Sequence, residues 1–381
     1  MSDARPSRPA PEGASGGSVR THTVGPEPTI ETTTLADGLR IVTERMPEAT
    51  SVSVGFYVGV GSRDEPDQLS GASHFLEHLL FKGTEERSAR SISMAVDAVG
   101  GEMNAFTSRE HTAYYTRLPA AHLAFGLELL SDVVERPAFR ANEIDAEREV
   151  ILEELLMAED TPDDVLHMEL MEAVFPGHPL GRETLGVPET IEALGRDEIA
   201  GFHAEHYRPA NVVVVAAGDL EHDAVVEGVA ACLSDVAGGV APLRVEPTPD
   251  LEPLVVVHRP TEQVHLMFGW RALYYDDPDR YAFYVANHVL GGGMSSRLFQ
   301  EIREERGLAY SVYSSMSSYS DCGLATVYAG TAPKHTDEVL TVLDDVHRVL
   351  DRVFTGPRTV AAVGPFEPDD PRLAATVARR S

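Results

Sequence analysis

The sequence predicts an α/β fold, specifically an α+β sandwich, in which two related domains each pack helices on a mainly antiparallel sheet. Three observations predict this fold. The chain has 381 residues, enough for about two domains of ordinary size. Helical and extended patterns alternate along it, and a Gly- and Pro-rich interval, SDVAGGVAPLRVEPTPDLEP, separates two halves of similar outline. We therefore expect domains at 29–235 and 254–381, joined by a linker over 236–253.

The first half opens with extended segments. TTTLADGLRIVTERM reads as two strands joined at Asp37-Gly38, a dipeptide that favours hairpin turns. SVSVGFYVGVGS is a further strand because it is rich in β-branched and aromatic residues. AYYTRLP and NVVVVAAG are also extended, between helical patterns at about 70–82, 120–135, 141–159, 163–175 and 188–206.

The second half repeats the first in outline, which indicates an internal duplication. EQVHLMFGWRALYYDDPD parallels SVSVGFYVGVGSRDEPD, YVANHVLGGG parallels HFLEHLLFKG, and HTDEVLTVLDDV parallels HLAFGLELLSDV. In this register His288 matches His78, whereas Tyr284 and Asn287 stand where the first copy has His74 and Glu77. Only the first copy is therefore expected to carry the chemically active residues.

Composition limits the partners. The net charge of -30 and the pI near 4.8 exclude nucleic acid and anionic membranes as general partners, and favour cationic or unfolded polypeptides. The cysteines, Cys232 and Cys322, are too few for a disulfide framework and suggest free thiols in a reducing compartment. With no apolar targeting segment and no run long enough to span a membrane, we expect a cytoplasmic protein with a disordered leader over 1–28; a mitochondrial transit peptide is the weaker alternative.

The segment GASHFLEHLLFKGT, residues 71–84, contains a candidate metal site. A helix from the potential N-cap Ser70 to Gly83 places His74 and His78 one turn apart on one face, with Glu77 beside them. Two imidazoles so arranged suit Zn²⁺, and an adjacent carboxylate can accept the proton of a metal-activated water. The H-x-x-E-H spacing is the inverzincin motif; on the pentapeptide alone, a polar helix face remains an equal alternative.

A second helix offers further carboxylates. In EIDAEREVILEELLMAED, Glu147 and Glu154 are two turns apart and share a face, whereas Glu149 and Glu153 point elsewhere. A solvated acidic face is the simpler interpretation of any one of these glutamates.

These residues together resemble the pitrilysin/insulinase class of zinc peptidases, especially its half-length members, such as bacterial processing-type peptidases and the catalytic subunit of the mitochondrial processing peptidase. In that family HxxEH is followed about 76 residues later by a glutamate ligand in an EREVILEE-like segment, which here selects Glu154. MNAFTSREHTAYY, DTPDD and GHPLGRETLG also match, so that the resemblance covers about residues 30–350. It implies one Zn²⁺ per chain, held by His74, His78 and Glu154, with Glu77 as general base and Glu147 in contact with a ligand.

The resemblance also implies a substrate site. Family substrates are similar to an added strand beside the zinc, and the matching segment here contains Asn104, Ala105 and Phe106. In the second half, Arg303 and Tyr310 match a family pair that reaches the site across the domain interface, binds substrate carbonyls and stabilises the oxyanion. HAEH, residues 203–206, matches a structural helix end of the family and is expected to be no metal site.

The second half departs from the family near 352–357, where GPRTVAAVGPF follows a helix directly and the counterparts of several first-copy helices are missing. We therefore expect a zinc endopeptidase that cleaves extended peptides or unfolded segments. The alternative is a catalytically impaired or non-catalytic subunit that binds peptides or a related peptidase, and a homodimer or a related partner subunit remains open. A structural zinc site in a non-enzyme is disfavoured because the set has three ligands and an added base.

Overall fold

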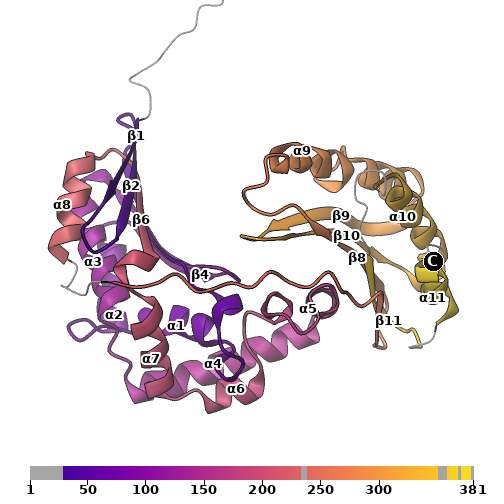
Figure 1. Cartoon of the computed structure of the whole chain (residues 1–381), viewed down its shortest axis with the longest axis horizontal. Helices are drawn as coiled ribbons and strands as arrows, with labels where there is room; N and C mark the ends of the chain where they lie inside the picture. Colours follow the sequence, from indigo (N-terminus) through magenta and orange to yellow (C-terminus); the bar gives the residue numbers. More distant parts are fainter. Residues whose placement is uncertain (1–28, 233–237, 351–357, 368–369, 379–381) are drawn as a thin grey trace, which may run out of the picture.

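The structure is a computed structural model that describes residues 29–232, 238–350, 358–367 and 370–378. It contains two α/β units, each built on one mixed and mostly antiparallel sheet (Figure 1). From residue 238 to Pro253 the described chain between the units has neither helix nor strand. The predicted fold class is confirmed; the predicted leader over 1–28 lies outside the described residues, and the domain limits at 235 and 254 stay a prediction.

Sheet one has six strands in the order β1-β2-β6-β3-β5-β4. β2 and β6 run parallel, and every other neighbouring pair is antiparallel. The predicted hairpin at Asp37-Gly38 joins β1 to β2, and Gly38 there has a φ of 98°. The strands are β1 (Thr29–Thr34), β2 (Arg40–Arg45), β3 (Ser51–Val58), β4 (Glu102–Thr107), β5 (Thr112–Pro119) and β6 (Val212–Gly218).

Sheet two has five strands in the order β7-β11-β8-β10-β9, and only β7 and β11 run parallel. The order and directions repeat those of β2-β6-β3-β5-β4, which confirms the internal duplication. The strands are β7 (Leu254–His258), β8 (Val264–Ala272), β9 (Ala309–Ser318), β10 (Gly323–Thr331) and β11 (Arg358–Gly364).

In the first unit the helices follow the predicted pattern with three differences. The segment predicted as one helix over 188–206 is broken because Gly195 is extended, with φ −99° and ψ 176°. Two helices, α2 and α8, were not predicted. The first unit has α1 (Ala72–Leu80), α2 (Ala89–Ala98), α3 (Leu123–Glu135), α4 (Ala141–Asp160), α5 (Pro162–Val174), α6 (Pro188–Ala193), α7 (Arg196–His206) and α8 (His222–Cys232); the second has α9 (Arg280–Gly291), the π-helix η6 (Phe299–Glu305), α10 (Thr336–Leu350) and α11 (Pro371–Ala378).

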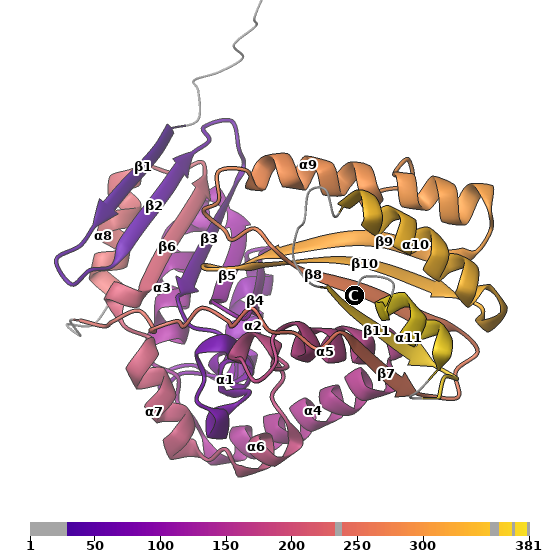
Figure 2. The ribbon, with the colours of Figure 1, turned by 45° about the vertical axis from the view of Figure 1, so that its right-hand side comes forward.

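The core of the first unit lies on one face of sheet one, where α1, α3, α7 and α8 pack (Figure 2). It includes Phe56 and Val214 from the sheet, Phe75 from α1 and Leu127 from α3, all at most 1% exposed. α1 is amphipathic, and its apolar residues are buried while its histidines lie at the rim of this core. The packing therefore holds the candidate metal helix against the sheet.

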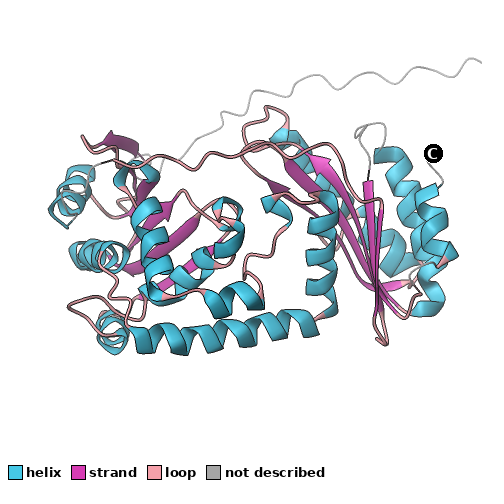
Figure 3. Ribbon diagram, turned by 60° about the horizontal axis from the view of Figure 1, so that its bottom comes forward, coloured by secondary structure: helices cyan, strands magenta, loops and turns pink. Residues whose placement is uncertain are grey.

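Helices pack on both faces of sheet two, and the helix on one face, α5, belongs to the first unit. α10, α11 and η6 pack on one face, whereas α5 packs on the other (Figure 2). Leu166, Leu170 and Val174 of α5 are fully buried in this contact, together with Ala361 and Val363 of β11. The long α4 leads directly into α5, so that the helix carrying Glu147 and Glu154 is joined to the second unit (Figure 3).

The second unit is shorter than the first. In the first unit α4 to α7 lie between α3 and β6, whereas only residues 351–357 separate α10 from β11, too few for four helices. The predicted point of shortening, 352–357, itself lies outside the described residues. α1 contacts α4 and α7, but its counterpart α9 leaves Tyr281, Val285 and Val289 more than half exposed.

Two smaller expectations concern thiols and membranes. Cys232 and Cys322 are both free in the structure, as the sequence suggests. Within the described ranges, no helix is both long and apolar enough to cross a membrane.

Candidate metal centre

The helix that carries the H-x-x-E-H motif begins at a glycine and not at the predicted cap Ser70. Gly71 has a φ of 93°, and an added Cβ would lie 2.5 Å from the Ile191 side chain, so only glycine fits. The buried Glu65 carboxylate accepts hydrogen bonds from the backbone N–H groups of Gly71 and Ser73, both at 2.7 Å. It thereby caps α1 in place of a local Ser side chain. Burial raises the pKa of Glu65 to about 7.

α4 presents its two candidate carboxylates to α1. Ile144, Glu147, Ile151 and Leu155 form its buried stripe, and Glu154 lies at the margin of that stripe with 36% of its side chain exposed. Glu149 and Glu153 are exposed, as the helical phase predicts. Seven-residue spacing therefore brings Glu147 and Glu154 to the same side of α4.

His74, His78 and Glu154 come together as a possible metal-binding group, the single group of this kind within the part of the chain that the structure describes. The Nε2 atoms of His74 and His78 lie 3.6 Å and 3.7 Å from Glu154 Oε2, and the two rings are 4.7 Å apart in edge-to-face contact. Ligand atoms about 2.1 Å from a shared zinc ion lie roughly 3.4 Å apart in tetrahedral geometry. The residues therefore fit a zinc ion with three protein ligands.

Burial favours a neutral imidazole at His74, the form in which histidine binds a metal ion. Burial, followed by the nearby His78, lowers the pKa of His74 to about 4. His78 Nδ1 lies 3.1 Å from Glu147 Oε2, and the other oxygen of Glu147 lies 2.6 Å from Lys82 Nζ. The Glu147 contact therefore orients His78 so that its Nε2 faces Glu154.

Glu77 lies beside this group with its carboxylate uncommitted. Among the described residues it forms no ion pair or hydrogen bond, and its side chain is partly exposed. The hydroxyls of Tyr114 and Tyr207 meet at 2.8 Å, and their pKa values are raised by burial and, in addition, by the charge of Glu77. The carboxylate is therefore near a buried hydroxyl pair and available for proton transfer.

The predicted substrate segment is an edge strand. β4 pairs only with β5 among the described strands, and its Thr107 hydroxyl reaches the Ser73 carbonyl of α1 at 3.4 Å. Asn104 and Phe106 are exposed, whereas Ala105 is buried. A cleft of about 480 Å³ lies beside this strand; it is lined by Phe81, Ile92, Ser93, Val96, Asp97, Gly101, Glu102, Met103, Asn104 and Tyr115.

Arg303 and Tyr310 are brought together but not to the metal group. The Arg303 guanidinium lies 4.7 Å from the centre of the Tyr310 ring, and Tyr310 is 76% exposed. No contact of either residue with His74, Glu77 or His78 is present in the described structure. Their predicted role at the site stays a prediction.

HAEH is a structural helix end. His203 Nε2 lies 2.8 Å from the Val134 carbonyl oxygen, and its ring stacks on Tyr207 at 4.4 Å. His206 contacts Phe202 at 4.5 Å. Burial lowers the pKa of His203 to about 4, so the ring is neutral and serves packing between α7 and α3.

Sequence reasoning missed Glu65 and Lys82. Lys82 is four residues after His78 in the segment predicted as helical up to Gly83, a spacing that predicts the same face, and this was a usable signal. In the structure it lies in the turn just after α1. Glu65 lies in the loop before α1, and no local pattern relates it to the cap.

The comparisons identify the family. A model of the insulinase family, peptidase family M16, matches residues 40–187, and one described as the peptidase M16 inactive domain matches residues 193–357. An uncharacterized zinc protease of Streptomyces coelicolor is 44% identical over 348 residues, which cover 89% of this chain and 76% of that protein. The chain belongs to the insulinase family of peptidases, M16.

Other relatives and solved structures agree with this assignment. An uncharacterized zinc protease of Bacillus subtilis is 39% identical over 320 residues, covering 84% of this chain and 78% of that protein. The crystal structure of a peptidase M16 inactive domain from Pseudomonas fluorescens has a TM-score of 0.83 at 19% identity and covers 89% of this chain and 98% of that one. A protease from Helicobacter pylori has a TM-score of 0.77 at 22% identity, with coverage of 89% and 100%. Both solved structures share the fold of this chain.

Proposed function

We propose that this M16 protein is a zinc-dependent endopeptidase that hydrolyses extended peptides or unfolded segments. The observation that carries the proposal is the convergence of His74, His78 and Glu154, from two helices, at distances that suit one zinc ion per chain. Relatives named zinc proteases support it. Family membership alone would not support the proposal, because proteins with one fold can have several functions.

The residues divide the chemistry between them. A zinc ion held by His74, His78 and Glu154 would supply Lewis acidity and lower the pKa of a bound water. Glu77 is assigned as the general base that accepts the water proton and delivers it to the leaving amine. The open edge of β4 is proposed to pair with the substrate backbone, with Asn104 holding the peptide near the scissile bond.

The test combines metal analysis with a quenched peptide library. The purified protein is expected to bind about one zinc ion per chain and to cleave unstructured peptides, with activity lost to a chelator and restored by zinc. Glu77→Gln should keep the zinc and lower kcat/KM by about 10²–10⁴-fold, because general-base catalysis contributes about that factor. Full activity of the zinc-loaded Glu77→Gln variant would refute the mechanism.

A second function has its own support. Among the described residues, the second unit has no counterparts of α4 to α7, and Arg303 and Tyr310 make no contact with the metal group. Both features favour a non-catalytic subunit that binds peptides or a related peptidase. Zinc binding without cleavage at any protein concentration would select this second function over the first.

A further inference from the structure

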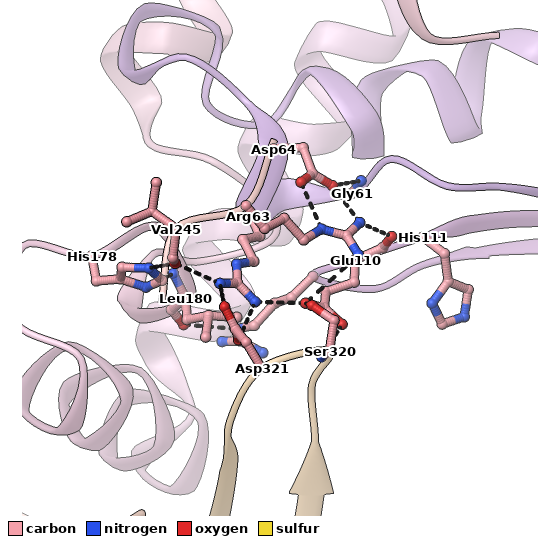
Figure 4. Close-up of polar contacts among 12 residues, drawn as sticks. Gly61, Arg63, Asp64, Glu110, His111, His178, Leu180, Val245, Ser320 and Asp321 are labelled. Atoms are coloured by element: carbon pink, nitrogen blue, oxygen red, sulfur yellow. Dashed lines mark hydrogen bonds and ion pairs between the residues drawn. The ribbon is translucent and has the colours of Figure 1, made fainter. Parts of the chain in front are cut away.

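Four chain segments from both units meet around one buried arginine, Arg63 (Figure 4). Two of these segments are the turns that join β4 to β5 and β9 to β10, and a third belongs to the connection between the units. The segments are 61–64, 108–111, 244–245 and 319–322.

The Arg63 guanidinium holds one carboxylate from each unit. Its side chain is only 2% exposed. Nη1 donates to Glu110 Oε1 at 2.6 Å and to Asp321 Oδ1 at 2.8 Å, while Nη2 bonds the second Asp321 oxygen and donates to the Val245 carbonyl at 2.7 Å. Such forked, charge-assisted bonds fix orientation as well as distance. We name Arg63, Glu110 and Asp321 the Arg63 clasp.

The two carboxylates occupy equivalent positions in the duplication. Each turn has four residues, 108–111 and 319–322, and each acid is the third of them. Ser320 completes the contact, because its backbone N–H and hydroxyl donate to the Glu110 carboxylate at 2.9 Å and 2.7 Å. One cation from the first unit therefore joins the matching turns of both sheets.

On the first-unit side the clasp is tied to the metal helix. The backbone N–H groups of Ser62 and Arg63 donate to the carbonyls of Ser108 and Arg109. Two residues after Arg63, the Glu65 carboxylate caps α1. A displacement of the clasp would therefore be transmitted directly to α1 and β4.

On the second-unit side the clasp holds one end of β9, and Tyr310 is near the other end. The eight residue steps from Tyr310 to Ser318 span about 26 Å at the rise of a strand. A rotation of about 10° at the clasp would move Tyr310 by roughly 5 Å over that length. A misplacement of a catalytic group by about 1 Å can lower the reaction rate about 100-fold. A small rotation at the clasp could therefore strongly lower the rate if a group at the far end of β9 takes part in the reaction.

We propose that Arg63 is a positioning residue for the peptidase reaction, which sets the orientation of sheet two, and with it Arg303 and Tyr310, relative to the metal group. The proposal rests on the proposed function and on the role at the site that the sequence predicts for Arg303 and Tyr310, and it adds a residue that touches neither substrate nor metal. α5 holds the face of sheet two, and the clasp attaches the turn between β9 and β10 at a separate point, which opposes rotation about α5.

The experiment compares Arg63→Met, Asp321→Asn and Asp321→Glu with the wild-type chain. The first two variants are expected to keep zinc and to lower kcat about tenfold or more, because Tyr310 is displaced, whereas Asp321→Glu should recover most of kcat. Arg45→Met is the matched control, since Arg45 forms an exposed ion pair with Glu221 far from the clasp along sheet one. Asp321 is partly exposed, so Asp321→Asn remains informative if Arg63→Met does not fold.

A kinetic cycle separates positioning from general stability. In a Tyr310→Phe background, Arg63→Met or Asp321→Asn should cost much less than in the wild type, because the group that they position is already lost. Equal costs in both backgrounds, or unchanged kcat in folded, zinc-loaded clasp variants, would overturn the proposal while leaving the peptidase function intact. A wild-type chain that binds zinc and cleaves no peptide would overturn both.

Discussion

At the residue scale, the two histidines of the metal group differ in how they are held. His78 is oriented by Glu147, which Lys82 in turn contacts. His74 Nδ1 is buried and has no hydrogen-bond partner in the described structure. The ring of His74 is therefore held by packing, whereas that of His78 depends on one carboxylate.

The Glu147 contact predicts a selective loss of metal affinity. Glu147→Ala should weaken zinc binding by about 10–100-fold, because removal of a group that orients a ligand typically has this effect. Glu149→Ala, on the exposed side of the same helix, is the matched control and should leave affinity unchanged. Competition with a chromogenic chelator measures both; equal affinities would show that His78 needs no such partner.

At the element scale, α1 depends on contacts that its own sequence does not contain. Its first turn is capped by Glu65 from the preceding loop, and its start fits only because Gly71 has a positive φ. Each is a single residue outside the H-x-x-E-H motif, and both act on the helix that carries His74 and His78.

A pair of glycine substitutions tests this dependence. Gly71→Ala should destabilise the protein by roughly 1–3 kcal/mol, because the backbone conformation is strained for alanine and the Cβ meets Ile191 and the Leu185 carbonyl. Gly201→Ala should stabilise it by roughly 0.5–1 kcal/mol, since Gly201 lies within α7 with open space around a Cβ. Urea unfolding gives both values; a stable Gly71→Ala variant would contradict the strain argument.

The contact between α7 and α3 predicts acid sensitivity. Burial lowers the pKa of His203 from 6.5 to about 4, so the unfolded chain binds one more proton between these values. The contribution of neutral His203 to the free energy of unfolding is fully present above pH 6.5. Roughly 3 kcal/mol of it is lost as the pH falls to 4. The stability of the wild type relative to His203→Gln should fall by this amount between pH 7 and pH 4, measured by urea unfolding. His288→Gln, on the exposed side of α9, is the control; a pH-independent difference for His203→Gln would refute the prediction.

At the scale of the whole molecule, the two units share a helix. α5 follows α4 in the first unit, yet its apolar side fills one face of sheet two. Among the described residues, no helix of the second unit packs on sheet one in return. The half-buried Val213 and Val215 of β6 lie on the face of sheet one that corresponds to the α5-covered face.

The shared helix predicts cooperative unfolding of both units. Leu170→Ala should lower stability by about 2–5 kcal/mol, because Leu170 is fully buried between α5 and sheet two. Leu156→Ala, with an exposed leucine on α4, should change it by less than about 0.5 kcal/mol. Calorimetry should show a single transition that shifts as a whole; two transitions with only one displaced would show that α5 does not couple the units.

The fold class, the duplication and the phase of the metal residues could all be predicted from the amino-acid sequence. These follow from local periodicity: His74 and His78 are one turn apart, and Glu147 and Glu154 two turns apart, wherever their helices pack. Tertiary structure alone decided that α4 faces α1, that Glu65 caps α1, that α5 covers sheet two and that Arg63 reaches Asp321, 258 residues away. The reason is physical, since these contacts depend on long-range packing and on buried charges that must find partners, and neither leaves a periodic trace in the sequence.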